Sequence, residues 1–158
     1  MKKAFVFDFD DTLATTDCKV IVRKWGKEIA RLTPAEYNNY PLADDCSFDY
    51  SEFTRLINPR ANFVMSLAQE VHGEGHEVYI LTARGIAAQD AINEFMLEHF
   101  IQCRAIICVG DEPDSIESAK SRIFMSIVNG VEKCYFYDDH SGNIDAIPNS
   151  EKVRKYLV

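Results

Sequence analysis

The first strand and the residues that end it constrain this chain most. Ala4 to Phe7 are four consecutive apolar residues, a pattern that predicts a strand buried on both faces of a parallel sheet. Asp8, Asp10, Asp11 and Thr12 follow at once. In open α/β sheets, ligands bind outside the carboxyl ends of the strands. We therefore expect a functional site where this strand ends.

Carboxylates so close together repel one another unless a cation lies among them, and Mg²⁺ takes oxygen ligands of this kind. The alternative is a solvated acidic turn, because Asp is common in turns. A second acidic pair, Asp138-Asp139, follows a strand-like run from Cys134 to Tyr137. This repetition favours a metal site over a solvated turn.

Strand-like and helix-like segments alternate along the rest of the chain. Strands are predicted at 78–81, 105–109 and 134–137, and helices at 33–36, from 58–59 to 73, around 92–99 and around 116–127, with a closing helix or strand after 144. This alternation predicts an α/β fold, a Rossmann-like three-layer sandwich with a central, mostly parallel sheet.

Parallel strands place their carboxyl ends on one edge of the sheet, so side chains distant in sequence should meet there. We expect Asp8, Asp10, Thr82 and Asp139 at that edge, with Lys120 near a helix start on the same side. The set offers a cation site, a hydroxyl, an ammonium and a spare carboxylate, which suits phosphoryl transfer. A carboxylate can serve there as acid and base, or as a nucleophile.

Composition limits the class of protein. The 158 residues suit one domain, and the formal charge of −8 argues against a surface that broadly attracts nucleic acid. Five cysteines, an odd number without a Cys-x-x-Cys pair, indicate reduced thiols and a cytoplasmic protein. Asp8 interrupts the first apolar run, so we expect neither a signal peptide nor a membrane span. Nothing in the sequence indicates an obligate protein partner.

An insertion at about 14–57, here called the flap, separates the first strand from the first long helix. Two β-like runs flank Trp25-Gly26, which predicts a hairpin with Trp25 at its tip. The hairpin carries Lys19, Arg23, Lys24, Lys27 and Arg31. Such a hairpin could attract a phosphorylated substrate and stack Trp25 on a base. The alternative is a solvated hairpin whose tryptophan folds back on the domain.

The residues resemble the motifs of the haloacid dehalogenase-like (HAD) phosphohydrolases over nearly the whole chain outside the flap. Asp8-Phe9-Asp10-Asp11-Thr12 is similar to their first motif, Asp-x-Asp-x-Thr. Thr82, Lys120 and the pair Asp138-Asp139 are similar to the second, third and fourth motifs. The chain also resembles compact, minimal-cap members found in bacteriophages.

The resemblance implies an Mg²⁺-dependent phosphatase that forms an aspartyl-phosphate. Asp8 would attack phosphorus, and Asp10 would protonate the leaving oxygen and then activate water. Thr82 and Lys120 would bind the phosphoryl group. Mg²⁺ would be held by Asp8, the backbone carbonyl of Asp10 and the late acidic pair, with Asp139 favoured over Asp138 as the direct ligand. Asn143, four residues after Asp139, departs from the acid expected there.

Several assignments stay open at this stage. Ala83, Arg84 and Trp25 are candidate substrate-binding residues, although Arg84 could instead pair with Asp111 or Glu112. Lys133 is a weaker alternative to Lys120.

The small cap implies an accessible site, and the substrate could be a phosphorylated small molecule, a nucleotide or a nucleic-acid end. The rival interpretations are a non-catalytic HAD-like phosphate-binding module and a phospho-receiver signalling domain.

Overall fold

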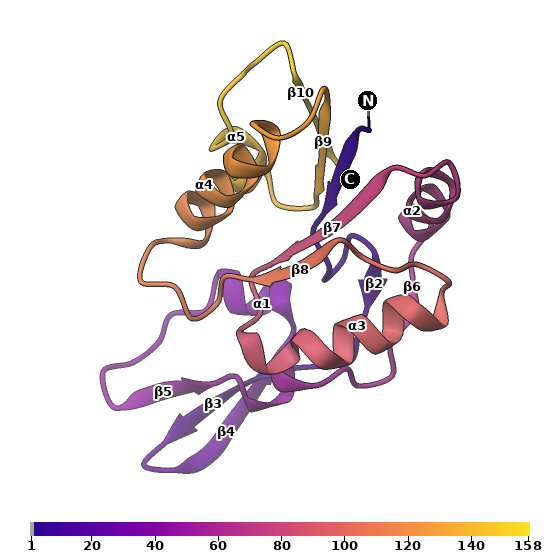
Figure 1. Ribbon diagram of the computed structural model, residues 1–158. Coiled ribbons are helices and arrows are strands. Elements are labelled where there is room, and N and C mark those ends of the chain that lie inside the picture. Colours follow the sequence, from indigo (N-terminus) through magenta and orange to yellow (C-terminus); the bar gives the residue numbers. More distant parts are fainter. Residues whose placement is uncertain (1) are drawn as a thin grey trace.

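The computed structural model describes residues 2–158 and contains a central parallel sheet with helices on both faces (Figure 1). The sheet has five strands in the order β10-β9-β1-β7-β8, and all four neighbouring pairs are parallel. These strands are β1 (Ala4–Phe7), β7 (Glu77–Thr82), β8 (Ala105–Cys108), β9 (Cys134–Asp138) and β10 (Val153–Leu157). The predicted Rossmann-like α/β sandwich is thus confirmed.

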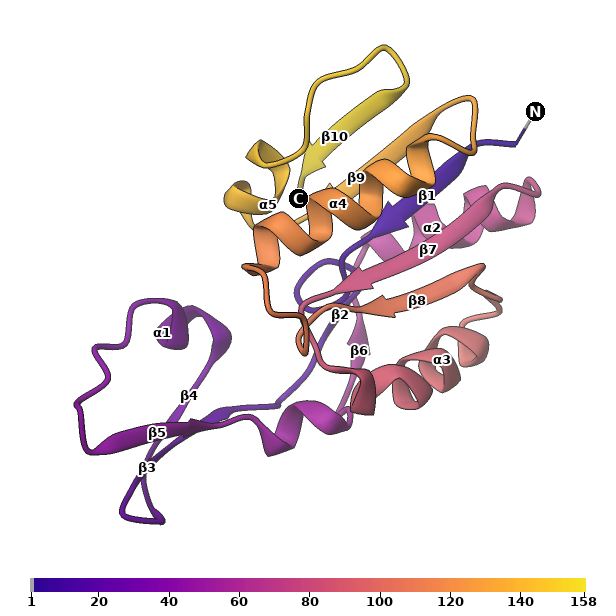
Figure 2. The same cartoon turned by 60° about the vertical axis from the view of Figure 1, so that its left-hand side comes forward.

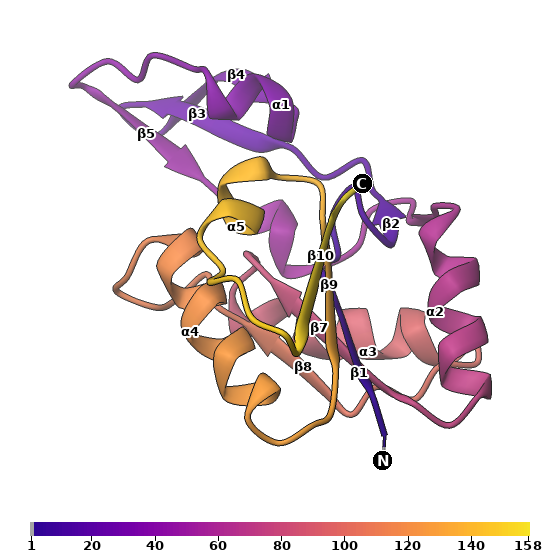
Figure 3. The same cartoon turned by 90° about the horizontal axis from the view of Figure 1, so that it is seen from above.

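Strand β1 lies in the middle of the sheet, and its four apolar side chains serve two separate cores. Phe5 and Phe7 pack toward α2 (Val64–Gly73) and α3 (Gln89–Glu98). Ala4 and Val6 pack toward α4 (Ile116–Val128), which lies beside α5 (Ser141–Asp145). Side chains alternate across a strand, so a centrally placed strand needs apolar residues at every position. Figure 3 shows the sheet between these two helical layers.

The helix predicted from Asn58-Pro59 begins later, and that prediction was wrong. Asn58 has a φ of 47°, and the next residues form the short strand β6 (Arg60–Ala61), which pairs with β2 (Ala14–Thr15). The helix starts only at Val64, and the preceding Phe63 is 83% exposed. The apolar period located the helix correctly, but the start depended on pairing with a distant strand.

The flap forms a lobe of its own beyond the carboxyl ends of the central strands (Figure 2). It contains a three-stranded antiparallel sheet in the order β4-β3-β5, made of β3 (Val20–Lys24), β4 (Lys27–Leu32) and β5 (Cys46–Asp49). Val20, Val22 and Leu32 form its small core. The helix α1 (Pro34–Asn38) lies where a helix was predicted, and it begins with a capping box formed by Thr33 and Glu36.

The hairpin tip is also as predicted, since Trp25 and Gly26 both have positive φ values, 50° and 78°. Tight two-residue turns with this geometry match the twist of the flanking strands. Two short 3₁₀ helices complete the elements, η1 (Ser51–Thr54) at the base of the flap and η2 (Ile86–Ala88) before α3. Among the helices of residues 2–158, none is both long and apolar enough to cross a membrane.

Asp49, at the end of β5, accepts hydrogen bonds from β3 and from η1, and its ionisation can be measured. Hydrogen bonds from Ser51, together with one from Arg23 Nε at 2.8 Å, lower the pKa of Asp49 to about 2. A carboxyl with a lowered folded-state pKa stabilises the fold above its unfolded pKa, and this stability disappears as the pH falls through the folded pKa. NMR titration should show Asp49 charged down to about pH 2, and Asp49→Asn should remove this acid dependence. Titration at the ordinary value for Asp would contradict the prediction.

Candidate functional site

Four charged side chains from three elements meet at the carboxyl edge of the sheet. Asp8 directly follows β1, Asp138 ends β9, and Asp139 comes next. One oxygen from each of these residues lies within 4.8 Å of the others, and we call the three the acidic cluster. Lys120, from the second turn of α4, donates from Nζ to Asp8 Oδ1 and to Asp138 Oδ2, both at 2.8 Å.

Lys120 is 1% exposed, unusually buried for a lysine. Burial would lower the pKa of Lys120, but the charges of Asp8 and Asp138 raise it above its ordinary value. The ammonium therefore stays charged, held between two carboxylates. Lys133, the alternative, lies elsewhere and donates to the backbone carbonyl of Glu151.

The remaining contacts of Asp8 and Asp138 are equally specific. Thr12 Oγ1 donates to Asp8 Oδ2 at 3.1 Å. Asp138 is fully buried and accepts hydrogen bonds from the backbone N–H of His140 and from Asn143 Nδ2. Asp139 is exposed, whereas Asp138 is already occupied by three donors. This difference is consistent with Asp139 as the more available metal ligand.

The acidic cluster carries more negative charge than Lys120 can neutralise. Three carboxylates against one ammonium leave two formal negative charges. Burial raises the pKa of Asp8 well above its ordinary value despite Lys120, and the charge of Asp138 raises it further. Nearby Asp11 follows the same trend, since burial and the charges of Asp139 and Asp10 raise its pKa. A divalent cation would supply the missing charge.

Asp10 lies beside the cluster, and Arg84 holds its carboxylate. Arg84 Nε donates to Asp10 Oδ2 and Nη2 to Asp10 Oδ1, both at 2.8 Å. The Asp10 side chain remains 25% exposed. Arg84 thus pairs with Asp10, and not with Asp111 or Glu112, which contact the backbone N–H of Ile86 and the side chain of Arg122. Asp10 and Arg84 are 74 residues apart, so no local sequence pattern indicates this pair.

Thr82 and Ala83 lie at the end of β7, next to β1 in the sheet. Thr82 is buried, and its Oγ1 accepts a hydrogen bond from the backbone N–H of Arg84. Within residues 2–158 no hydrogen bond joins Thr82 to the acidic cluster. Ala83 is exposed directly after it. Both residues are therefore at the predicted edge, without a direct contact to the carboxylates.

The basic residues of the predicted hairpin belong to a flap that is not basic as a whole. Residues 14–57 hold six Lys and Arg against seven Asp and Glu. Arg23, Lys24 and Arg31 pair with carboxylates of Asp49, Asp45, Glu28 and Glu52 within the flap itself. The hairpin is basic by itself because most of the carboxylates that pair with it come later in the sequence.

Trp25 does not fold back on the domain. Its side chain is 81% exposed at the tip, with Lys24 Nζ 4.9 Å from the ring centroid. In Figure 2 the tip projects away from the carboxyl ends of the central strands. The structure therefore separates Trp25 from the acidic cluster.

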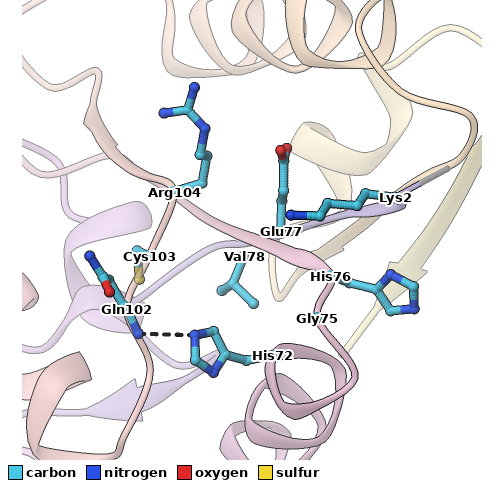
Figure 4. Close-up of a pocket in the computed structure, with 9 residues that line it drawn as sticks. All are labelled: Lys2, His72, Gly75, His76, Glu77, Val78, Gln102, Cys103 and Arg104. Carbon is cyan, nitrogen blue, oxygen red and sulfur yellow. Dashed lines mark hydrogen bonds between the residues drawn. The ribbon is translucent and has the colours of Figure 1, made fainter.

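A separate pocket lies at the opposite, amino edge of the sheet, where β7 begins (Figure 4). It is lined by Lys2, His72, Gly75, His76, Glu77, Val78, Gln102, Cys103 and Arg104. Its charges are mixed, and His72 Nε2 already accepts a hydrogen bond from the backbone N–H of Gln102. This pocket contributes nothing to the acidic cluster.

No model of a known protein family matches this chain. A search of curated proteins likewise finds no match. The chemistry of the site is therefore the basis for assigning a function.

Proposed function

We propose that this protein is an Mg²⁺-dependent phosphatase of the HAD-like type, which hydrolyses a phosphate monoester through an aspartyl-phosphate on Asp8. The observation that carries the proposal is the position of Lys120 Nζ, 2.8 Å from both Asp8 and Asp138 within the acidic cluster. A buried ammonium beside a potential nucleophile can neutralise a phosphoryl group, and positioning and charge neutralisation dominate phosphoryl transfer.

The donor set fits Mg²⁺. Asp8, Asp138 and Asp139 offer carboxylate oxygens, the ligands that this hard cation prefers. Asn143 Oδ1 is buried beside Asp138 and has no hydrogen-bond partner within residues 2–158, so the site contains one further unsatisfied acceptor. When bound, the ion would neutralise charge on the phosphoryl oxygens.

In this proposal each side chain of the site has a separate role in the reaction. Asp8 would attack phosphorus while Asp10 gives its proton to the leaving oxygen as the ester bond breaks. Asp10 would then take a proton from water, whose oxygen attacks the aspartyl-phosphate and releases inorganic phosphate and free Asp8. Lys120 and Thr82 would hold the phosphoryl oxygens in both steps.

The charges favour a phosphorylated small molecule or a mononucleotide over a nucleic-acid end. The chain carries a formal charge of −8, and three basic side chains of the flap are already paired with carboxylates. Nucleic-acid binding depends on unpaired Lys and Arg that neutralise several phosphates.

The single tryptophan gives a direct test of substrate size. Because Trp25 lies away from the acidic cluster, we expect Trp25→Ala to leave kcat/KM for small phosphate esters at the wild-type value. A loss confined to phosphorylated oligonucleotides would indicate stacking of a base on Trp25. A comparable loss with the smallest ester would contradict the separation seen in the structure.

The function is tested by measuring phosphate release from alkyl phosphates, mononucleotides and 3′- or 5′-phosphorylated oligonucleotides, each with Mg²⁺ and with a chelator. The proposal expects turnover of at least one small ester that the chelator abolishes. Phosphate binding without turnover of any substrate would instead support a binding module. A long-lived aspartyl-phosphate after incubation with acetyl phosphate would support a receiver-like domain.

A further inference from the structure

Arg84 is buried between the flap and Asp10, and all five of its N–H donors are engaged. Nε and one Nη2 hydrogen bond go to the Asp10 carboxylate. Nη1 donates to the backbone carbonyls of Phe53 and Arg55, at 3.0 Å and 2.7 Å. Nη2 also donates to Thr16 Oγ1 at 3.4 Å and to Cys18 Sγ at 3.7 Å.

The flap contacts come from its base. Phe53 belongs to η1, and Arg55 is its C-cap residue. A short helix leaves its last carbonyls without partners inside the helix, so they can accept from Arg84, and the Arg55 carbonyl also accepts from Cys18 Sγ. The Phe53 ring also covers the guanidinium, with its centroid 4.8 Å from Arg84 Cζ. The base of the flap therefore supplies two carbonyl acceptors and one side wall of the arginine site, and Thr16 and Cys18 near its start supply the remaining acceptors.

The backbone of Arg84 is fixed to the central sheet. Its carbonyl accepts from Gly110 N at 3.0 Å, and its N–H donates to Thr82 Oγ1. A Cβ on Gly110 would lie 2.5 Å from the Ala83 carbonyl, so only glycine allows the segments after β7 and β8 to come this close. The backbone of Arg84 is consequently held by the central sheet, and every N–H donor of its guanidinium has an acceptor.

We propose that Arg84 is a positioning residue that links the docked flap to the orientation of the Asp10 carboxylate. With no donor left, Arg84 cannot bind a substrate phosphate without breaking one of these contacts, which argues against the substrate-binding role expected from the sequence. If the flap base withdraws, the buried guanidinium loses two acceptors and must reorient, and the carboxylate that it holds moves with it. This inference rests on the proposed function, in which Asp10 is the acid and base.

The experiment compares wild type with Arg84→Lys, which keeps the charge and loses the planar fork. Substrates are an alkyl phosphate, whose leaving oxygen needs a proton, and 4-nitrophenyl phosphate, which leaves without one. General acid–base catalysis contributes on the order of 100-fold or more, so kcat/KM should fall by about that factor for the alkyl ester and by about threefold or less for the nitrophenyl ester. Inhibition by inorganic phosphate should keep its wild-type constant.

Two further variants separate positioning from general damage. Phe53→Leu removes only the ring over the guanidinium and should give a smaller loss with the same dependence on the leaving group, even if Arg84→Lys fails to fold. Arg60→Lys changes an exposed side chain that pairs with Asp17 and makes none of these contacts, so it should match wild type. Equal losses for both esters, or weaker inhibition by phosphate, would overturn the positioning role.

The two proposals can fail separately. If wild type hydrolyses neither ester in an Asp8-dependent way, the proposed function fails and the catalytic role of Arg84 fails with it. If wild type is active but the Arg84→Lys effect is independent of the leaving group, only the present inference fails. Hydrogen exchange at residues 51–56 provides a measurement without turnover. Faster exchange in Arg84→Lys supports the link between Arg84 and the flap, and unchanged exchange overturns it.

Discussion

Replacing Asp8 by Asn should lower kcat for any phosphate-ester substrate on the order of 10⁴-fold or more, as expected when a covalent nucleophile is removed. The fold should survive, because the Asn side-chain oxygen can still accept from Thr12 and Lys120 keeps its pair with Asp138. Steady-state phosphate release, with circular dichroism and thermal melting of the same samples, measures both expectations.

Asp11→Asn is the matched control, since Asp11 lies three residues away, is exposed and contacts only Thr15 through its side chain. We expect its activity to remain close to wild type. Acid quenching and mass spectrometry during turnover should detect a phosphate adduct on the wild-type segment containing Asp8, and none in Asp8→Asn. Full activity of Asp8→Asn would refute covalent catalysis at this residue.

Lys120→Met should cause the largest loss of stability. Removing one partner of a buried ion pair leaves uncompensated charge and costs about 3–5 kcal/mol. Here two carboxylates, Asp8 and Asp138, would lose their common cation. Urea unfolding measured by circular dichroism should show a correspondingly lower midpoint, and Mg²⁺ should recover part of the loss because it restores positive charge between the carboxylates.

Lys133→Met gives the comparison, because Lys133 donates only to an exposed backbone carbonyl, and such surface changes usually stay within about 0.5 kcal/mol. The double variant Lys120→Met with Asp138→Asn should lose less than the sum of its parts, since one stranded charge is removed as well. An unchanged urea midpoint for Lys120→Met would show that the buried ion pairs contribute little to the fold.

Much of the architecture was predictable because its signals are local. Four apolar residues followed by acids in β1, the apolar runs of β7 to β9, and the helical periods of α3 and α4 each arise within a few neighbouring residues. The parallel arrangement then follows from their alternation, and it brings strand ends together. The capping box at Thr33 and the Trp25-Gly26 turn are local in the same sense.

The features that the sequence did not predict depend on partners far apart in the chain. The start of α2 was misplaced because β6 pairs with β2, more than forty residues earlier. The hairpin is basic by itself because the carboxylates that pair with Arg23 and Lys24 lie further along the chain. They belong to the end of β5 and to the residue just before β5. Periodicity and local charge do not reveal such pairings.

The sequence alone determined the order of the central strands β1, β7, β8 and β9 with the helices between them, and the edge at which Asp8, Thr82 and Asp139 lie. These features depend on short-range patterns and on the common direction of parallel strands. Only the tertiary structure decided that Lys120 is buried between Asp8 and Asp138, and that Arg84 joins Asp10 to the flap across 74 residues. Charged side chains can be buried only where partners from other elements satisfy them, and no single segment of the sequence specifies such partners.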